Sequence, residues 1–268
     1  MAGGAGKRGG VLSTNDGPRN SEPETRDSSR ALPAEVREVA DALIADLEDN
    51  LRALLWHGSW ARGEQTPESD HDMIVVVRQM NEATLLGLSG VFDGRSGWST
   101  YVKTEQELRH YPLTGRLQFH YGFIALYGGI DAPPVTREGI IEDLRRTATD
   151  VQHECRYRLI HGSGGKLYAG MDPAYARLRT ARWMYYQAKL AVLALKAREV
   201  LRGQSYPLSR HELRRRLSDE EELAIIDIID LWPALRQGFE EDVTPLALQL
   251  DAFMRKLVNE LEEVKPPQ

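Results

Sequence analysis

The stretch HGSWARGEQTPESDHDMIVVV, residues 57–77, connects two apolar runs through a polar segment. The run before it, Leu51 to Trp56, has Arg52 as its only charge, and the run that ends it extends from Met73 to Val77. Short apolar runs on either side of a glycine-containing turn predict two buried strands. The stretch therefore predicts a sheet whose first two strands meet at this polar segment.

The second predicted strand begins with a pair of acids, Asp70 and Asp72, separated by His71. Side chains two apart in a strand point to the same face, so we expect the two aspartates to project together and His71 to point away. Neighbouring carboxylates repel each other, and burying both without a partner is costly. A divalent cation removes this conflict, and Mg²⁺ favours carboxylate oxygens together with substrate phosphates. We therefore predict that Asp70 and Asp72 hold Mg²⁺, or Mn²⁺ in its place, whereas His71 packs or forms hydrogen bonds.

The turn after the first strand has the residues of a phosphate cradle. Gly58 lets the backbone approach a phosphate closely, and the Ser59 hydroxyl and nearby N–H groups can donate to it. Arg62 follows in the same turn, where it can offset phosphate charge or bond local carbonyls, and both alternatives stay open. A phosphate cradle beside a metal-holding acid pair predicts phosphoryl or nucleotidyl transfer.

At this point the sequence resembles the small nucleotidyltransferase-domain proteins of the polymerase-β-like superfamily. That superfamily includes aminoglycoside nucleotidyltransferases and the minimal nucleotidyltransferases that pair with helical HEPN-type proteins. The resemblance rests on Gly58-Ser59, Ala61-Arg62-Gly63, Ser69-Asp70, and Asp72 followed by Ile74-Val75-Val76. It implies an enzyme that moves a nucleoside monophosphate from an NTP, with ATP as first choice, to a hydroxyl-bearing small molecule or protein.

The third predicted strand, Trp98 to Val102, departs from this family. Its members usually carry a third carboxylate there, as metal ligand or general base, but this strand has no acid. Glu105 is the nearest candidate. Glu107 is better explained as part of a capping box with Thr104 that opens a helix. The protein could therefore be a catalytically weak or inactive nucleotide-binding module, or a transferase whose acceptor brings its own ionised group.

Length and composition indicate a globular protein with one large or two modest domains. The chain has 268 residues, 41% of them hydrophobic and 28% charged, with a net charge of −6 that argues against wholesale nucleic-acid binding. The single cysteine, Cys155, excludes an internal disulfide. Because no apolar run could span a membrane and the N-terminus lacks a signal-peptide pattern, we expect a cytosolic protein.

Three segments follow from the pattern of residues along the chain. Residues 1–32 are almost without apolar residues and are expected to form a disordered tail. Residues 33–131 are expected to form the α/β nucleotidyltransferase domain, with a small mixed sheet and a helix from Pro33. An aromatic segment from Phe119 to Tyr127 is expected to join its core rather than stack on bases. Residues 132–268 are expected to form an all-α bundle, because Pro133-Pro134 marks a boundary and helical periodicity follows.

Several helices can be placed within the predicted bundle. One begins after Thr136 and runs toward His161, and a long one runs from Pro173 to Arg202. The stripe of the long helix is expected to face a core, and it consists of Trp183, Tyr186, Leu190, Leu193 and Ala197. Capping boxes at Ser209 and Ser218 open further helices, and a last one covers Pro245 to Val264. The resemblance implies a HEPN-like bundle, and such a bundle also suggests a helical protein partner of toxin–antitoxin type.

The long helix also has a basic character. Most of its basic residues are expected to form a solvated face, but a part turned toward a cleft could neutralise a triphosphate or contact RNA. These residues are Arg177, Arg179, Arg182, Lys189, Lys196, Arg198 and Arg202. Two Arg…His pairs, Arg146 with His153 and Arg156 with His161, match the spacing of HEPN ribonucleases, a spacing that an arginine-rich helix also produces by chance.

Overall fold

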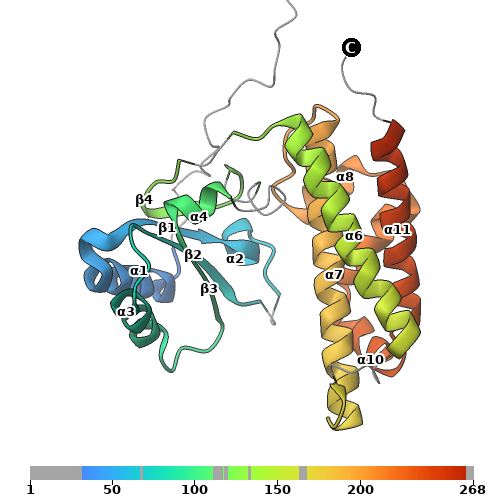
Figure 1. Cartoon of the computed structure of the whole chain (residues 1–268), viewed down its shortest axis with the longest axis horizontal. Coiled ribbons are helices and arrows are strands. Elements are labelled where there is room, and N and C mark those ends of the chain that lie inside the picture. The colour runs from blue at the N-terminus through green and yellow to red at the C-terminus, as the bar shows by residue number, and fades with distance from the viewer. Residues whose placement is uncertain are drawn as a thin grey trace, which may run out of the picture.

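The computed structural model describes residues 32–263, except 67–68, 111–116, 118–119, 132–133 and 163–167. It consists of a mixed sheet with short helices followed by a helical bundle, which stand side by side in Figure 1. The expected α/β part with a small mixed sheet and the expected all-α part are both confirmed. Apart from Leu32, the predicted tail lies outside the described residues, as does Phe119.

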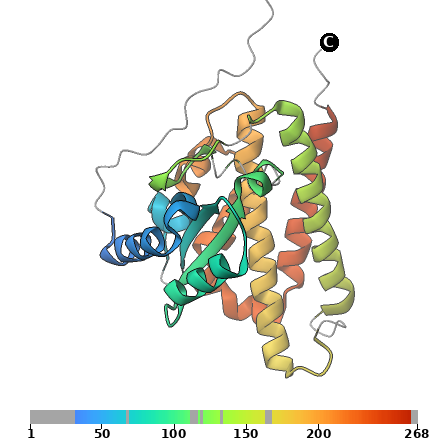
Figure 2. The same ribbon diagram turned by 60° about the vertical axis from the view of Figure 1, so that its left-hand side comes forward.

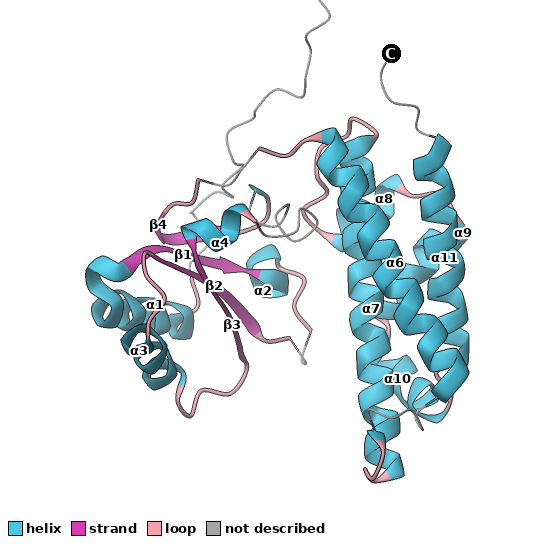
Figure 3. Ribbon diagram, in the orientation of Figure 1, coloured by secondary structure: helices cyan, strands magenta, loops and turns pink. Residues whose placement is uncertain are grey.

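The sheet contains four strands in the order β3-β2-β1-β4. Strand β1 (Leu51–His57) pairs antiparallel with both β2 (His71–Val77) and β4 (Ile124–Gly128), whereas β3 (Trp98–Thr104) runs parallel to β2. The parallel pair is possible because the chain crosses over between β2 and β3 through α3 (Glu82–Phe92). Figure 3 shows the strands in magenta between the flanking helices.

The two faces of the sheet have different neighbours. Helices α1 (Ala34–Leu47) and α3 pack on one face, where Leu43 of α1 joins the alternate strand residues Leu54 and Val75 in a buried cluster. On the other face, Ala53, Leu55, Ile74 and Val76 are buried in a second cluster with Leu108 of α4 (Glu105–Arg109) and Phe123. The central strands β1 and β2 are therefore buried on both faces, whereas β3 and β4 are partly exposed. The remaining end of the second face is left to form a site.

The strand register brings polar residues together on that second face. Asp72 of β2 pairs with His57 on the antiparallel strand β1 and with Ser99 on the parallel strand β3. Paired residues point to the same side of a sheet. One face therefore presents a histidine, an aspartate and a serine beside the bundle, where β1 ends and where β2 and β3 begin.

The bundle contains six helices within the described residues. Its long helices are α6 (Arg137–His161), α7 (Pro173–Leu201) and α11 (Thr244–Glu263). The shorter ones are α8 (Arg210–Arg216), α9 (Glu220–Asp230) and α10 (Trp232–Glu241). A further short helix, the 3-10 helix η1 (Glu48–Asn50), belongs to the sheet part and precedes β1. The bundle has its own apolar core, which also takes in Leu117 from the segment before β4. No described helix has the length and apolarity that crossing a membrane requires.

The predicted core stripe of α7 is wrong in part. Trp183 and Tyr186 are about half exposed, at 43% and 45%, whereas Met184, Ala188 and the other residues of the neighbouring stripe are buried. Helix α7 has apolar residues on several faces, so periodicity alone did not show which face the other helices would cover. Tyr186, Leu190 and Leu193 of the predicted stripe line a cavity between α7 and the sheet part. Figure 2 shows the sheet part beside α7.

Two helix starts differ in detail from the expected capping boxes. At α8, Ser209 accepts from the Glu212 amide as expected, but the Glu212 carboxylate accepts from the Leu208 amide instead of the Ser209 amide. At α9 the cap is Asp219, not Ser218, because the Asp219 carboxylate accepts from the amides of Glu221 and Glu222. A carboxylate competes well for two amides at a positive helix end, which explains the shift by one residue.

Candidate active site

A cavity of about 760 Å³ lies between the sheet part and the bundle. Its sheet-side wall comes from α2 (Gly58–Arg62), the loop that follows, β2 and β3, and its other wall comes mainly from α6 and α7. The five residues predicted from sequence all line this cavity: Gly58, Ser59, Arg62, Asp70 and Asp72. The structure thus brings the predicted residues together, while their chemical roles stay predictions.

The turn after β1 requires glycine for two reasons. Gly58 has φ +78°, a left-handed conformation that L side chains rarely adopt. A Cβ at this position would also lie 1.8 Å from Oδ2 of Asp72. The Asp72 carboxylate therefore packs directly against the backbone of the turn. The sequence predicted Gly58 for the approach of a phosphate, and the structure adds this second steric reason.

The two aspartates interact unfavourably in the protein alone. Burial, followed by the charge of Asp70, raises the pKa of Asp72 to about 7, although Arg62 and Lys189 act in the opposite direction. A divalent cation between the carboxylates would relieve both causes. The described residues contain no group of three or more His, Cys, Asp or Glu placed to hold a metal ion. The pair therefore suits Mg²⁺ shared with substrate phosphates, since Mg²⁺ is commonly bound by one or two carboxylates and its substrate.

His57 is a residue of this site that the sequence analysis did not single out. Burial and the nearby Arg62 charge lower its pKa to about 3, so the imidazole is neutral. Both ring nitrogens are buried without a hydrogen-bond partner among the described residues. The available signal was its position directly before Gly58, because strand alternation places it on the face that carries Asp72.

His71 lies on the opposite face, as predicted. Its ring stacks on Trp60 with centroids 4.5 Å apart, and its Nε2 is 2.8 Å from a carboxylate oxygen of Glu35 in α1. Trp98 contacts the same ring, with centroids 4.9 Å apart. The prediction that His71 packs and forms hydrogen bonds is confirmed.

The structure places neither candidate for a third carboxylate in the cavity. Glu107 and Thr104 form the expected capping box at the start of α4. Glu105 accepts a hydrogen bond from Arg52 Nε at 2.7 Å and does not line the cavity. The β3 residues that do line it are Ser99 and Tyr101. The departure from the family pattern seen in the sequence therefore persists in three dimensions.

The bundle wall of the cavity is basic and aromatic. Lys189 and Lys196 of α7 line it, and the ammonium of Lys189 lies 4.9 Å from the centroid of the Tyr185 ring. Tyr186 also lines it, and burial, followed by the nearby Tyr101 of β3, raises the Tyr186 pKa. Part of the basic series on α7 thus faces the cleft, an alternative that the sequence left open.

Other basic residues serve the bundle itself. Arg198 of that series is buried and donates to the Glu222 carboxylate at 2.7 Å. In the two Arg…His pairs, Arg146 lines the cavity, whereas Arg156 donates to Asp251 at 2.8 Å and His161 lies against the Tyr157 ring. These partners account for Arg156 and His161 without a ribonuclease site.

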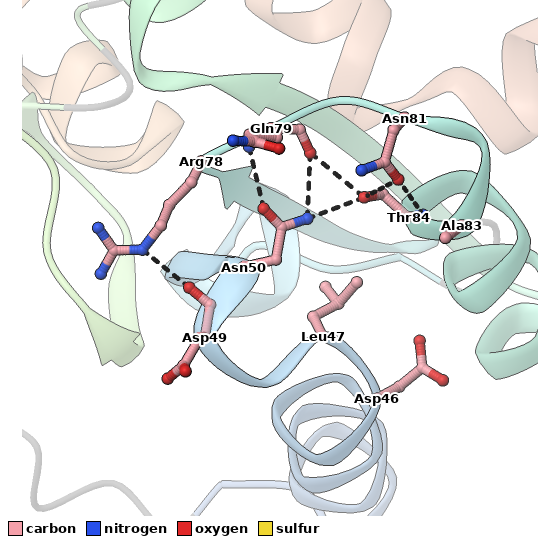
Figure 4. Close-up of a pocket in the computed structure, with 9 residues that line it drawn as sticks. All are labelled: Asp46, Leu47, Asp49, Asn50, Arg78, Gln79, Asn81, Ala83 and Thr84. Atoms are coloured by element: carbon pink, nitrogen blue, oxygen red, sulfur yellow. Dashed lines mark hydrogen bonds between the residues drawn. The ribbon is translucent and has the colours of Figure 1, made fainter.

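A second hollow, of about 410 Å³, lies where α1 leads into β1 and where α3 begins (Figure 4). Its polar groups bond to one another. The side-chain amide of Asn50 donates to Gln79 O at 3.0 Å and to Thr84 Oγ1 at 2.8 Å. Asn81 Oδ1 accepts from the backbone amide of Thr84. Because these groups serve to fix the helix ends, the hollow offers little to a ligand.

Comparison with known proteins gave matches among solved structures. No protein-family model and no characterised protein sequence matches the chain. Among solved structures, the chain is similar to the crystal structure of spectinomycin adenyltransferase AAD(9) from Enterococcus faecialis with ATP and spectinomycin. The TM-score is 0.43 and the sequence identity 15%, and the alignment covers 85% of this chain and 98% of that chain.

Proposed function

We propose that this protein is a Mg²⁺-dependent nucleotidyltransferase that moves a nucleoside monophosphate from an NTP to a hydroxyl-bearing acceptor. One observation carries the proposal: Asp70 and Asp72 share a cavity with the Gly58-Ser59 turn. Burial, followed by the charge of Asp70, raises the pKa of Asp72, and a cation bound between the two carboxylates would offset this charge. We take ATP as the first NTP to test.

The chain supplies binding groups for the triphosphate. The Ser59 hydroxyl and the amides of the turn would hold the β- and γ-phosphates, and Asp70 and Asp72 would hold the metal. Arg62 and Lys189, whose charges both act on Asp72, would offset phosphate charge from opposite walls. When bound, Mg²⁺ would withdraw electron density from the phosphates and stabilise the leaving pyrophosphate.

The acceptor would bind in the remainder of the cavity, between Tyr101 of β3 and Tyr186 of α7. Its oxygen forms a bond to the α-phosphorus while the bond from that phosphorus to the bridging oxygen breaks, and pyrophosphate leaves. The hydroxyl proton passes to solvent, unless the acceptor group is already ionised, because β3 provides no carboxylate to take it. The acceptor can be a small molecule or a protein.

A second candidate function is nucleotide binding with little or no turnover. The specific observation in its favour is that Ser99 and Tyr101 occupy the β3 positions beside Asp72 and Ile74, and that Glu105 is paired with Arg52. Without a β3 carboxylate that acts as general base, the reaction would lose a contribution of about 10²–10⁴ in rate. Binding would survive this loss because the phosphate and metal groups remain.

Incubation of the purified protein with Mg²⁺ and each labelled NTP, with a panel of acceptors, tests the proposal. Pyrophosphate release with label transfer supports the transferase, and saturable binding without release supports the binding module. Label that arrives on a co-purifying helical protein would support the toxin–antitoxin reading. Absence of Mg²⁺-dependent NTP binding would contradict all of these.

The Asp70→Asn variant provides a sharper test. It should abolish Mg²⁺-dependent NTP binding yet keep the fold, because it removes a repulsion with Asp72 while leaving the shape of the side chain. Titration calorimetry measures the affinity, and circular dichroism with thermal melting checks the fold. Asp41→Asn, an exposed change in α1, serves as the control. Equal Mg²⁺-dependent affinity in Asp70→Asn and wild type would rule out the site.

Further expectations stay predictions. These are the cytosolic location, the domain boundary at residue 131 and the HEPN-like nature of the bundle. A contact with nucleic acid also stays open, and it would involve the basic residues on the cavity wall.

A further inference from the structure

Glu64 is a buried acid beside the candidate active site for which the proposed reaction has no direct use. It lies in the loop between α2 and β2, two residues after Arg62, and its side chain is 7% exposed. A carboxylate so far removed from water is costly unless charged partners surround it. Its partners come from both parts of the molecule.

The contacts of Glu64 fasten the loop to the bundle. Its Oε2 accepts from Arg62 Nε at 2.8 Å, and its Oε1 accepts from the backbone amide of Arg210, the first residue of α8. The Arg210 guanidinium returns a hydrogen bond to the Glu64 carbonyl at 3.2 Å and bonds to Asp230 of α9 at 2.8 Å. Backbone and side chain thus bond in both directions between this loop and the bundle.

Glu64 is also the shared anion of a group of cations. Burial alone would raise its pKa, but Lys196, Arg62 and Arg210 together lower it below the ordinary value. Lys196 lines the same cavity, and its ammonium donates to Leu208 O at 3.0 Å and lies 5.7 Å from the centroid of the Tyr206 ring. If Glu64 were neutral, Arg62 and Arg210 would repel each other and Arg62 would lose its acceptor.

Neighbouring contacts also join the sheet part to the bundle in this region. Tyr121, just before β4, stacks on Tyr206 of the bundle with ring centroids 5.0 Å apart. Gly122 has φ +77°, and a Cβ there would lie 3.4 Å from Arg62 Cδ and 3.8 Å from a methyl group of Leu208. The Arg62 side chain therefore passes between the sheet part and the bundle, with Glu64 bonded to its guanidinium.

From these contacts we propose that Glu64 is a positioning residue. It holds Arg62 toward the phosphate turn and ties the loop that leads to Asp70 against α8, so that both walls of the cavity are fixed before nucleotide binds. This inference rests on the proposed function for its nucleotide. The contact itself can be tested without one.

The test compares Glu64→Gln, which keeps the size of the side chain but removes its charge, with Glu38→Gln. Glu38 also forms an ion pair with an arginine, Arg95, at 2.8 Å in the sheet part, but outside the cavity. The first readout is hydrogen exchange at the Arg210 amide, measured by NMR without nucleotide. The second is the affinity for ATP with Mg²⁺.

We expect Glu64→Gln to speed exchange at the Arg210 amide and to weaken ATP binding by about 10- to 100-fold, the range for hydrogen bonds to charged groups. Glu38→Gln should change neither. Glu64→Asp keeps the charge, so it should restore part of the ATP affinity, which a merely structural role would not predict. If Glu64→Gln does not fold, the same two readouts on Glu64→Asp decide, with a smaller loss expected.

The two proposals fail in different ways. If wild type binds no ATP but exchange at Arg210 depends on Glu64, the contact is real and the nucleotide site is wrong. If wild type binds ATP and Glu64→Gln changes neither exchange nor affinity, the positioning role is overturned. Faster exchange with unchanged ATP affinity overturns it as well, because the contact would then not serve the site.

Discussion

At the residue scale, Gly58 links local backbone conformation to the site. We expect Gly58→Ala to destabilise the protein by about 1–3 kcal/mol, since the residue has a positive φ and the new Cβ would collide with Asp72. Chemical denaturation measures the loss, and ATP binding should fall with it as Asp72 is displaced. The matched control is Gly90→Ala in α3, where a Cβ meets nothing within 4 Å and alanine should stabilise the helix. Equal stability changes in the two variants would contradict this account.

Lys196 gives a prediction about pH at the same scale. Burial, followed by Arg62, lowers its pKa from 10.5 to about 7. Between pH 7 and 10.5 the unfolded chain therefore binds a proton at this position that the folded protein does not. Folding stability contributed by this residue should rise with pH across that window and stay level below it.

The measurement compares wild type with Lys196→Met, which keeps most of the side chain's apolar length. The free energy of unfolding of wild type, minus that of the variant, should increase from pH 6 to 10 as measured by denaturation. Relative to wild type, the variant should therefore be most stable near pH 6. A difference independent of pH would mean that the lysine keeps an ordinary pKa.

At the element scale, substitutions at the start of α9 distinguish Asp219 from Ser218 as the N-cap of the helix. Asp219 accepts from two helix amides, and its other oxygen bonds to Lys256 of α11, so Asp219→Ala should lower the melting temperature. Ser218→Ala should leave it nearly unchanged, because Ser218 caps nothing there. The reverse order of effects would restore the cap predicted from the sequence pattern.

Helix α7 shows why element faces are harder to predict than elements. Its limits, Pro173 to Leu201, follow from a proline suited to a first turn and a glycine beyond the end, and the sequence predicted them to within one residue. Which stripe is buried depended on where α6, α9 and α11 pack, which local sequence does not contain. The small residues Ala181, Ala188 and Ala191 lie in the core because they let the neighbouring helices approach closely.

At the scale of the whole molecule, the sheet part and the bundle have separate apolar clusters and meet across the cavity. A nucleotide that touches both walls should stabilise both parts, by about 2.7 kcal/mol at 100 times the dissociation constant. We expect Mg²⁺ with ATP to raise the melting temperatures of both the sheet part and the bundle, measured by calorimetry. Asp70→Asn should abolish this shift. A shift confined to one part would place the nucleotide away from the shared cavity.

Sequence by itself predicted the order of sheet and bundle, the limits of α7, the capping box at Thr104 and the five cavity-lining residues Gly58, Ser59, Arg62, Asp70 and Asp72. These follow from local periodicity, backbone preferences and strand alternation, which act over a few residues. Only the tertiary structure decided that Lys189, Lys196 and Tyr186 face those residues, that His57 adjoins Asp72 and that Glu64 bonds to Arg210. Such contacts join residues far apart in the chain, and their partners are chosen by packing and charge across the whole fold.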